Sequence, residues 1–528
     1  MRHIESSKRI QTRTYERGLK MHFWKKTITA VLACLMMLSA LGTTASAVDE
    51  WDGTITIVQS SDVIGFDPTA STDTNNKNVL KNMVSRLYET DDYFNPVPVL
   101  ATSYTQVDDY IWEFKIAQGV KFHDGTELTV DDVIYSLQRA KEKSSSGKTL
   151  LGPVAAFEKV DEETLRITTS TVYGSLLTAL SNSACTILSQ EWIEKAEAGE
   201  CSWDDVIKNG ATGRYILDKR EIGNSCVLLK NENYFDPDDA AQNDKLIFRI
   251  IPEATTRTIM VQTGEADVNV NFDTAAMADC LADPNVQVLE HESSTIYYIA
   301  LNCEKGPFTS KELRQAVAWA INRADCLEVG YNGYGKVWSN VWAPTVYGAL
   351  DDPYTYDMEK AQALVAASGY AGQEIRACVK TDAEERIAQV VEAYLSMVGI
   401  NMTFSRIDNT VLTEVMANNE YDMAFDYTAF YNDPELFVGR QFQASGIGAK
   451  NYAHYTNEEV DALMEQAKAT LDESARAEIY HQINTILCDD CPWIGMFNSN
   501  LYALARTGIS GVNINVETTY WYNTICYK

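Results

Sequence analysis

Basic side chains are scarce in this sequence. Its 528 residues contain 44 Lys and Arg against 74 Asp and Glu, which gives a formal net charge of −30. A surface this negative repels phosphate backbones and anionic headgroups, so nucleic-acid binding and membrane-surface binding are disfavoured. Histidine is also rare, and beyond residue 47 only His123, His291, His454 and His481 remain. A histidine-based triad or a zinc cluster therefore has few side chains to draw on.

Signatures of catalysis are missing as well. The sequence contains neither the H-E-x-x-H zinc motif nor the G-x-S-x-G nucleophile elbow. The glycine-rich stretch 330–336 is one residue short of a phosphate-binding loop, and Val337 stands where Ser or Thr would have to reach Mg²⁺. We therefore predict a protein that is not an enzyme and that has no cofactor and no metal site. An exported hydrolase remains the alternative, which turnover of a peptide or glycoside panel would support.

The one long apolar run lies near the start of the chain. Two lysines precede residues 28–41, which are apolar but too short to span a bilayer comfortably, and a small-x-small pattern follows at residues 45–47. This order predicts a signal peptide over residues 1–47, with Met1 or Met21 as the first residue. A membrane anchor is the alternative. Lipid attachment at Cys34 is disfavoured because Cys34 lies inside the apolar run. We expect export to the periplasm or the cell surface.

The expected mature chain, residues 48–528, is still more acidic and holds ten cysteines. The leader has eight basic and two acidic side chains, so the remainder carries a formal net charge of −36. An even number of cysteines outside the cytosol permits disulfides, although spacing does not reveal their pairing. Cys488 and Cys491 form an isolated C-x-x-C, open to interpretation as a redox pair, a strained disulfide or half of a zinc site. A structural role is favoured, because no second pair completes a metal site.

Beyond the leader, strand and helix patterns alternate. Residues 54–58, 111–116 and 164–168 have the β-branched or alternating character of strands. Residues 384–398 show helical spacing of apolar side chains and are followed by a glycine that suits a left-handed stop. Thr309 with Glu312, and Thr456 with Glu459, have the spacing of capping boxes. This mixture predicts α/β lobes with short connections.

An ordered series of segments resembles one family. The series comprises residues 100–104, 112–114, 119–126, 128–134, 212–215, 228–235, 251–254, 264–267, 313–318, 321–323, 356–361, 369–370 and 421–424. Typical members of the series are Gly-Val-Lys-Phe-His-Asp-Gly-Thr at 119–126 and Thr-Gly-Arg-Tyr at 212–215. From about residue 51 to 525 the chain resembles the extracellular solute-binding proteins of the dipeptide/oligopeptide class (family 5), which feed ABC importers.

The resemblance implies both a fold and a role. The fold would be α/β, two-lobed and periplasmic-binding-protein-like (class II), enlarged by an extra subdomain, with the ligand cleft between the lobes. Lobe I would cover residues 48–302 with the subdomain near 67–213, lobe II residues 303–490, and residues 491–528 would return to lobe I. A ligand that contacts both lobes would favour the closed form. The role would be a monomeric receptor that delivers peptides or peptide-like solutes to the membrane permease of an ABC importer.

The resemblance also locates an amine-binding position, and this sequence departs from it. In the family an aspartate after a strand neutralises the α-amino group of the peptide. Matching Asp433-Pro434 to the acid-proline pair of the family puts Phe430 at that position, and Phe cannot neutralise an ammonium. Either Asp426 substitutes, or the ligand lacks a free amine and is an oligosaccharide, an opine or a metal complex. Asp433 itself has the pattern of a helix N-cap followed by Pro.

The remaining ligand-binding candidates surround the expected cleft. Arg386, near the start of helix 384–398, suits a ligand carboxylate, because the planar guanidinium forms paired hydrogen bonds. Aromatic side chains after the strand suit stacking, and those in the loop 341–348 suit a pocket wall; other candidates follow the first strand or belong to the Thr-Gly-Arg-Tyr motif. These further candidates are Tyr427, Phe430, Tyr431, Asn432, Trp342, Tyr347, Ser60, Ser61, Asp62, Thr212 and Tyr215.

Overall fold

An eleven-stranded sheet runs through the computed structural model, which describes residues 51–70, 73–92, 95–429, 433–515 and 519–528. Its main path has the order β15-β14-β16-β12-β17-β11-β1-β10-β9-β8, and β13 pairs with β17. The strands are β1 (Thr54–Gln59), β8 (Tyr215–Glu221), β9 (Ser225–Lys230), β10 (Lys245–Ile250), β11 (Val268–Asn269), β12 (Val286–Leu301), β13 (Lys336–Val337), β14 (Ile375–Val379), β15 (Met402–Arg406), β16 (Met423–Ala429) and β17 (Trp493–Arg506).

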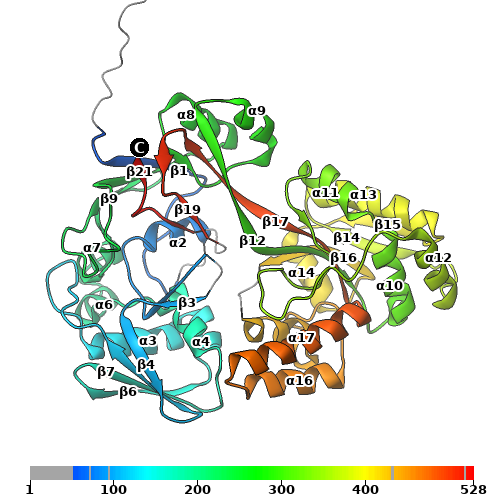
Figure 1. Cartoon of the computed structure of the whole chain (residues 1–528), viewed down its shortest axis with the longest axis horizontal. Coiled ribbons are helices and arrows are strands. Elements are labelled where there is room, and N and C mark those ends of the chain that lie inside the picture. Colours follow the sequence, from blue (N-terminus) through cyan, green and yellow to red (C-terminus); the bar gives the residue numbers. More distant parts are fainter. Residues whose placement is uncertain (1–50, 71–72, 93–94, 430–432, 516–518) are drawn as a thin grey trace, which may run out of the picture. The chain divides into compact units, whose positions relative to one another are not determined.

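Two long antiparallel strands hold this sheet together. β12 and β17 pair from Val286↔Arg506 to Ala300↔Trp493, with two register shifts on the way. They run side by side in Figure 1, green against red. At one end β17 continues through β11 to β1, and at the other end β12 pairs with β16. The two strands β12 and β17 therefore connect the β15-β14-β16 end of the sheet with the β11-β1-β10-β9-β8 end.

Smaller sheets lie outside this path. A four-stranded sheet has the order β4-β5-β7-β6, and the described part of the chain also forms three two-stranded sheets. The four-stranded sheet consists of β4 (Ala101–Gln106), β5 (Ile111–Ile116), β6 (Val154–Asp161) and β7 (Thr164–Thr169). The two-stranded sheets pair β2 (Tyr88–Thr90) with β3 (Pro96–Pro98), β18 (Ile509–Ser510) with β21 (Cys526–Tyr527), and β19 (Asn513–Ile514) with β20 (Tyr520–Trp521).

Helices alternate with the strands along the chain. Before β12 they are α2 (Thr74–Leu80), α3 (Val130–Lys143), α4 (Ser145–Leu150), α5 (Leu176–Leu180), α6 (Gln190–Glu197), α7 (Trp203–Gly210), α8 (Ala254–Thr263) and α9 (Met277–Ala282). After β12 they are α10 (Lys311–Ala320), α11 (Arg323–Tyr331), α12 (Met358–Ala367), α13 (Asp382–Met397), α14 (Asn409–Ala417), α15 (Val438–Phe442), α16 (Glu458–Lys468) and α17 (Glu473–Asp490). Among the described residues, no helix combines the length and apolarity that crossing a bilayer requires.

Several separate apolar cores stabilise these layers. One core, which contains Phe114 and Leu137, joins the four-stranded sheet to the helices around it. Two larger cores pack the helices that follow β12 against β12, β16 and β17. β14 pairs in parallel with β15 and β16, and its alternate residues Ile375, Ala377 and Val379 are buried. The helices that follow β12 therefore pack on two separate apolar cores.

The expected elements are present, with small shifts at the caps. The predicted strands correspond to β1, β5 and β7, and the predicted helix 384–398 is α13, followed by Gly399 at φ 81°. Two caps are wrong by one residue. Ser310 accepts the hydrogen bond from Leu313 N in place of Thr309, and Asn457 caps α16 in place of Thr456. In both cases the neighbouring residue is also a good N-cap, and sequence spacing does not decide between them.

The ten cysteines of residues 48–528 are free thiols in the structure. Cys491 ends α17 in a left-handed conformation (φ 52°), and the Cys488 thiol lies 3.2 Å from Asn484 Oδ1 one turn earlier. Burial raises the pKa of both thiols, to about 12 for Cys488 and about 11 for Cys491. Both thiols of the C-x-x-C motif therefore lie buried at the end of α17. The possible lipid site, Cys34, lies outside the described residues.

Candidate ligand-binding site

The outer half of β16 carries the first part of the site. β16 pairs antiparallel with β12, so that Asp426 lies opposite Tyr298 and Tyr427 opposite Tyr297. The first three residues of the strand are buried, whereas Tyr427 is 48 % exposed. Successive side chains of a strand point to opposite faces. Asp426 and Thr428 therefore share one face of the sheet, and Tyr427 lies on the other.

Asp426 already has two partners. One carboxylate oxygen forms an ion pair with the Lys380 ammonium, and the Tyr298 hydroxyl donates a hydrogen bond of 3.1 Å to the other. The side chains of Lys380 and Asp426 are only 8 % and 16 % exposed. Burial, together with the Asp426 charge, raises the pKa of Tyr298 well above its ordinary value. The hydroxyl therefore stays protonated, and the negative charge of Asp426 is already compensated.

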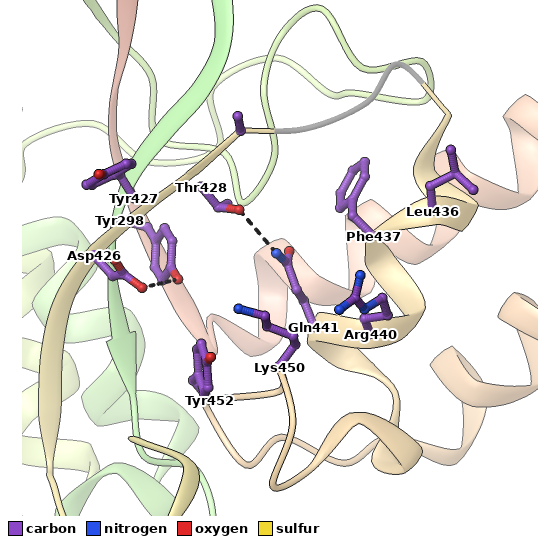
Figure 2. A pocket seen from close by; sticks show the side chains of 11 residues that line it. Tyr298, Asp426, Tyr427, Thr428, Leu436, Phe437, Arg440, Gln441, Lys450 and Tyr452 are labelled. Carbon is purple, nitrogen blue, oxygen red and sulfur yellow. Dashed lines mark hydrogen bonds between the residues drawn. The ribbon is translucent and has the colours of Figure 1, made fainter. Parts of the chain in front are cut away.

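A cavity of about 190 Å³ opens beside Asp426. Figure 2 shows Asp426 and Tyr298 on one side and Arg440 and Gln441, from α15, on the other. The Gln441 amide donates a hydrogen bond of 3.4 Å to the Thr428 hydroxyl across the gap. The residues that line the cavity are Tyr298, Asp426, Tyr427, Thr428, Ala429, Leu436, Phe437, Arg440, Gln441, Lys450 and Tyr452. Aromatic walls with a few polar groups are typical of a pocket for an organic ligand.

Aromatic packing fixes the walls of this pocket from behind. The Phe437 ring meets the buried Trp342 ring edge to face, with centroids 6.2 Å apart. Tyr298 stacks on Trp493 at 3.7 Å, which anchors the other wall to β17. Edge-to-face and offset ring contacts are the favoured geometries of aromatic pairs. The pocket walls therefore rest on the apolar core.

The helical turn that leads into α15 also holds a buried ion cluster. Arg476 of α17 contacts both Asp433 and Glu435, and the Ser175 hydroxyl lies 2.6 Å from Asp433 Oδ2 and 2.8 Å from Glu435 Oε2. Burial and the neighbouring Asp433 charge raise the pKa of Glu435 to about 7. Leu436, next in the chain, packs against the core that contains the four-stranded sheet. Ser175, which precedes β12 in the sequence, therefore meets residues that follow β12 at this cluster.

The expected pocket walls Trp342 and Tyr347 occupy different places. Trp342 is fully buried behind Phe437 and supports the pocket from the second layer. Tyr347 is not among the lining residues; its ring packs edge to face on Tyr480, with the Arg476 guanidinium 6.0 Å from its centroid. Tyr347 therefore belongs to the ion cluster.

Arg386 lies away from this pocket. Its guanidinium donates hydrogen bonds of 3.0 Å to the Val329 carbonyl and 3.1 Å to the Gly330 carbonyl. Both carbonyls belong to the last turn of α11, where a cation is favourable because helix C-termini carry partial negative charge. The prediction that Arg386 binds a ligand carboxylate stays untested, and its visible partners are structural.

The candidates after the first strand hold a loop together. The Asn75 amide donates to the hydroxyls of Ser60, at 3.1 Å, and of Ser61, at 2.7 Å. Asp62 accepts hydrogen bonds from the backbone N–H groups of Val63 and Gly223. The three candidates are partly exposed, so they stay possible ligand contacts, but the pocket beside Asp426 does not include them.

The Thr-Gly-Arg-Tyr motif proves to be packed tightly. Thr212 is buried, and the Tyr215 hydroxyl donates a hydrogen bond of 2.9 Å to Asn243 Oδ1 in the interior. A Cβ on Gly213 would stand 2.1 Å from the carbonyl carbon of Met83, so glycine is needed for close approach. That approach is to the Met83 backbone. The prediction that Thr212 and Tyr215 contact the ligand stays untested.

Part of the predicted site lies outside the described residues, and part of the pocket was not predicted. Phe430, Tyr431 and Asn432 are in the first group. The second group comprises Tyr298, Thr428, Ala429, Leu436, Phe437, Arg440, Gln441, Lys450 and Tyr452. Thr428 and Ala429 directly follow the predicted Asp426 and Tyr427, and the other seven come from three separate segments that no spacing connects. One signal in the sequence could have indicated the residues after Asp433. The predicted helix start at Asp433-Pro434 follows closely after the strand that carries Asp426, so the first helical turns are expected near the end of that strand.

Comparison with known proteins identifies the class of this protein. Residues 95–449 match the family model described as bacterial extracellular solute-binding proteins, family 5 middle. The chain therefore belongs to the family 5 solute-binding proteins of ABC importers. The match covers the four-stranded sheet and most of the pocket, including Asp426 and Arg440.

Individual relatives agree with this assignment. The chain is 29 % identical over 445 residues to heme-binding protein A of Haemophilus influenzae, covering 78 % of this chain and 81 % of the relative. It is 25 % identical over 486 residues to glutathione-binding protein GsiB of Escherichia coli K12, covering 88 % and 93 %. The solved structure of HbpA2 from Haemophilus parasuis superposes with a TM-score of 0.82 at 24 % identity, over 90 % of this chain and 100 % of that one. The fold is that of the two-lobed α/β periplasmic binding proteins.

Proposed function

We propose that this protein is an exported receptor that captures a peptide or peptide-like solute and delivers it to the membrane permease of an ABC importer. The observation that carries the proposal is the cavity beside Asp426, in which aromatic walls and hydrogen-bonding groups converge from β12, β16 and α15. The named ligands of the relatives include glutathione, itself a small peptide, and haem. A monomer that binds the solute and releases it chemically unchanged suits this role.

The proposal includes export and a division into lobes. Residues 1–47 act as the signal peptide, and N-terminal sequencing of the protein released by cells tests this: the first residue should be Val48. The lobes have the boundaries 48–302 and 303–490, with residues 67–213 as a subdomain and 491–528 returning to lobe I. The two long strands β12 and β17, which end and begin near these boundaries, support the division.

Calorimetry on residues 48–528 tests the receptor role directly. Di- to pentapeptides, glutathione and haem are titrated, and small-angle scattering follows the radius of gyration. We expect binding of at least one peptide or peptide-like probe together with compaction, because a ligand that contacts both lobes favours the closed form. Mass spectrometry should recover the ligand unchanged. Hydrolysis of the probe would favour the exported-hydrolase alternative, and absence of binding across the panel would contradict the receptor.

A second candidate is the same receptor with a non-peptide ligand such as an oligosaccharide, an opine or a metal complex. The ion pair between Asp426 and Lys380 favours it, because an ammonium arriving there would have to compete for a carboxylate that is already neutralised. Titration of free-amine peptides against their N-acetylated forms separates the two candidates. Tight binding of free-amine peptides that is lost in Asp426→Asn would contradict the second candidate.

A further inference from the structure

The pocket beside Asp426 has an excess of positive charge. Of its charged residues, Asp426 is compensated by Lys380, whereas Arg440 and Lys450 have no carboxylate partner among the residues that the structure describes. Arg440 and Lys450 are both exposed, and an adjoining cavity of about 240 Å³ also has both side chains in its wall. Two uncompensated cations thus line the same two cavities in a protein whose formal net charge is −30.

The neighbouring acids are occupied elsewhere. Glu435, which lines the adjoining cavity, is paired with Arg476, and Glu465 is paired with Lys468. Neither acid therefore balances Arg440 or Lys450. An acidic protein surface repels anionic solutes at long range, so a local positive pocket creates a preference for an anionic group at this place.

The walls define what the anion must be attached to. Phe437 and Tyr452 are buried aromatic walls of the pocket. Gln441 and Thr428 supply hydrogen-bonding groups between the apolar walls and the cations. An inorganic ion would contact only the cations, whereas an organic acid can also place an apolar body against these aromatic walls and direct its anion toward the cations.

We propose that this pocket binds a carboxylate group of the transported solute, held by Arg440 and Lys450, with the adjacent apolar part of the solute against Phe437 and Tyr452. This deepens the proposed receptor function by naming its substrate class: organic acids, including peptides bound through a carboxylate. Arg440 presents a planar fork that matches a carboxylate, and Lys450 adds a point charge. The substrate need not present an ammonium at this end.

Matched probes test the proposal. N-acetyl-phenylalanyl-alanine and its C-terminal amide differ only in the carboxylate, and neither has a free amine. Calorimetry on the wild type should show the acid binding at least roughly tenfold tighter than the amide, because charge-assisted hydrogen bonds are the stronger kind. The acid should also lose affinity as the ionic strength rises from about 0.01 M to about 1 M, since its partners are solvent-accessible.

The variants Arg440→Gln and Lys450→Gln, alone and together, should bring the acid-to-amide affinity ratio close to one. The control Arg406→Gln removes an exposed cation that already faces Asp382, and should leave the ratio unchanged. Circular dichroism verifies that each variant is folded. Equal binding of acid and amide by the wild type, or an unchanged ratio in the double variant, would overturn the carboxylate site while leaving the receptor in place. Failure of every probe, the receptor panel included, would overturn both.

Discussion

Arg476 and Asp433 form a two-pronged ion pair in the interior: Nη1 lies 2.8 Å from Oδ2 and Nη2 lies 2.9 Å from Oδ1. Their side chains are 6 % and 9 % exposed. The Asp433 carboxylate also accepts the Glu435 N–H as the cap of the short turn that leads to α15. One carboxylate therefore caps the turn beside the pocket and attaches it to α17.

Removing the guanidinium should destabilise the protein strongly. In Arg476→Met two buried carboxylates lose their counter-charge, and we expect the free energy of unfolding to fall by about 3–5 kcal/mol. Urea denaturation followed by circular dichroism measures the change. Arg406→Gln breaks an exposed pair and should cost less than about 1 kcal/mol. Equal losses in the two variants would contradict the buried role of Arg476.

The same cluster should make stability depend on pH through Glu435. Ser175 Oγ lies within hydrogen-bonding distance of Asp433, Glu435 and an Arg476 N–H. The Ser175 hydroxyl has one proton and can donate it to only one of the two carboxylates. A protonated Glu435 can donate a hydrogen bond to the Ser175 oxygen, and the second contact is then also a hydrogen bond. Burial and Asp433 raise the pKa of Glu435 from 4.5 to about 7, so the folded protein holds this proton when the unfolded chain has lost it.

The contribution of Glu435 is therefore fully present below about pH 4.5 and is lost as the pH rises to about 7. Glu435→Gln keeps a neutral donor at all pH values. Denaturation of both proteins between pH 4.5 and 8 measures the difference in free energy of unfolding, which should move in favour of the variant as pH rises. A difference that is constant over this range would contradict a titrating Glu435.

Asp426 and Lys380 should behave as one unit. Asp426→Asn leaves a buried ammonium without its counter-charge, and we expect a loss of about 3 kcal/mol in the free energy of unfolding. The double variant Asp426→Asn/Lys380→Met removes both charges and should recover much of that loss. Urea denaturation of the four proteins of this cycle gives the coupling energy directly. Additive losses would show that the two groups do not interact.

Gly213 and Gly65 form a matched pair of glycine positions. A methyl group at Gly213 would meet the Met83 backbone at 2.1 Å, whereas one at Gly65 would meet nothing within 4 Å. Gly213→Ala should therefore lower the free energy of unfolding by about 3 kcal/mol, and Gly65→Ala should be close to neutral. Thermal unfolding of both variants checks the contrast, which fails if Gly213→Ala unfolds at the wild-type temperature.

Much of the local structure was predictable because it depends on near neighbours. The strand 111–116 is β5 without adjustment, and α13 begins at the capping box of Thr381 and Glu384, one turn from the predicted start. Asp433 is the N-cap that its Pro434 neighbour indicated. These features involve hydrogen bonds and burial within a few residues, which spacing captures.

The partners of charged side chains were not predictable. Nothing in the spacing shows that Lys380 compensates Asp426 across 46 residues, or that Arg386 is held by carbonyls of α11. Arg440 and Lys450 look like ordinary surface cations in the sequence. Their significance depends on which acids lie near them, and that follows only from packing.

The sequence by itself determined the family, the alternating α/β elements and the acidic character, because motif order, periodicity and charge are properties of the chain in one dimension. Only the tertiary structure decided which charges are paired and which are free. β12, β16 and α15 bring together residues more than a hundred positions apart, and the fixed distances between them leave Asp426 neutralised while Arg440 and Lys450 face an open pocket.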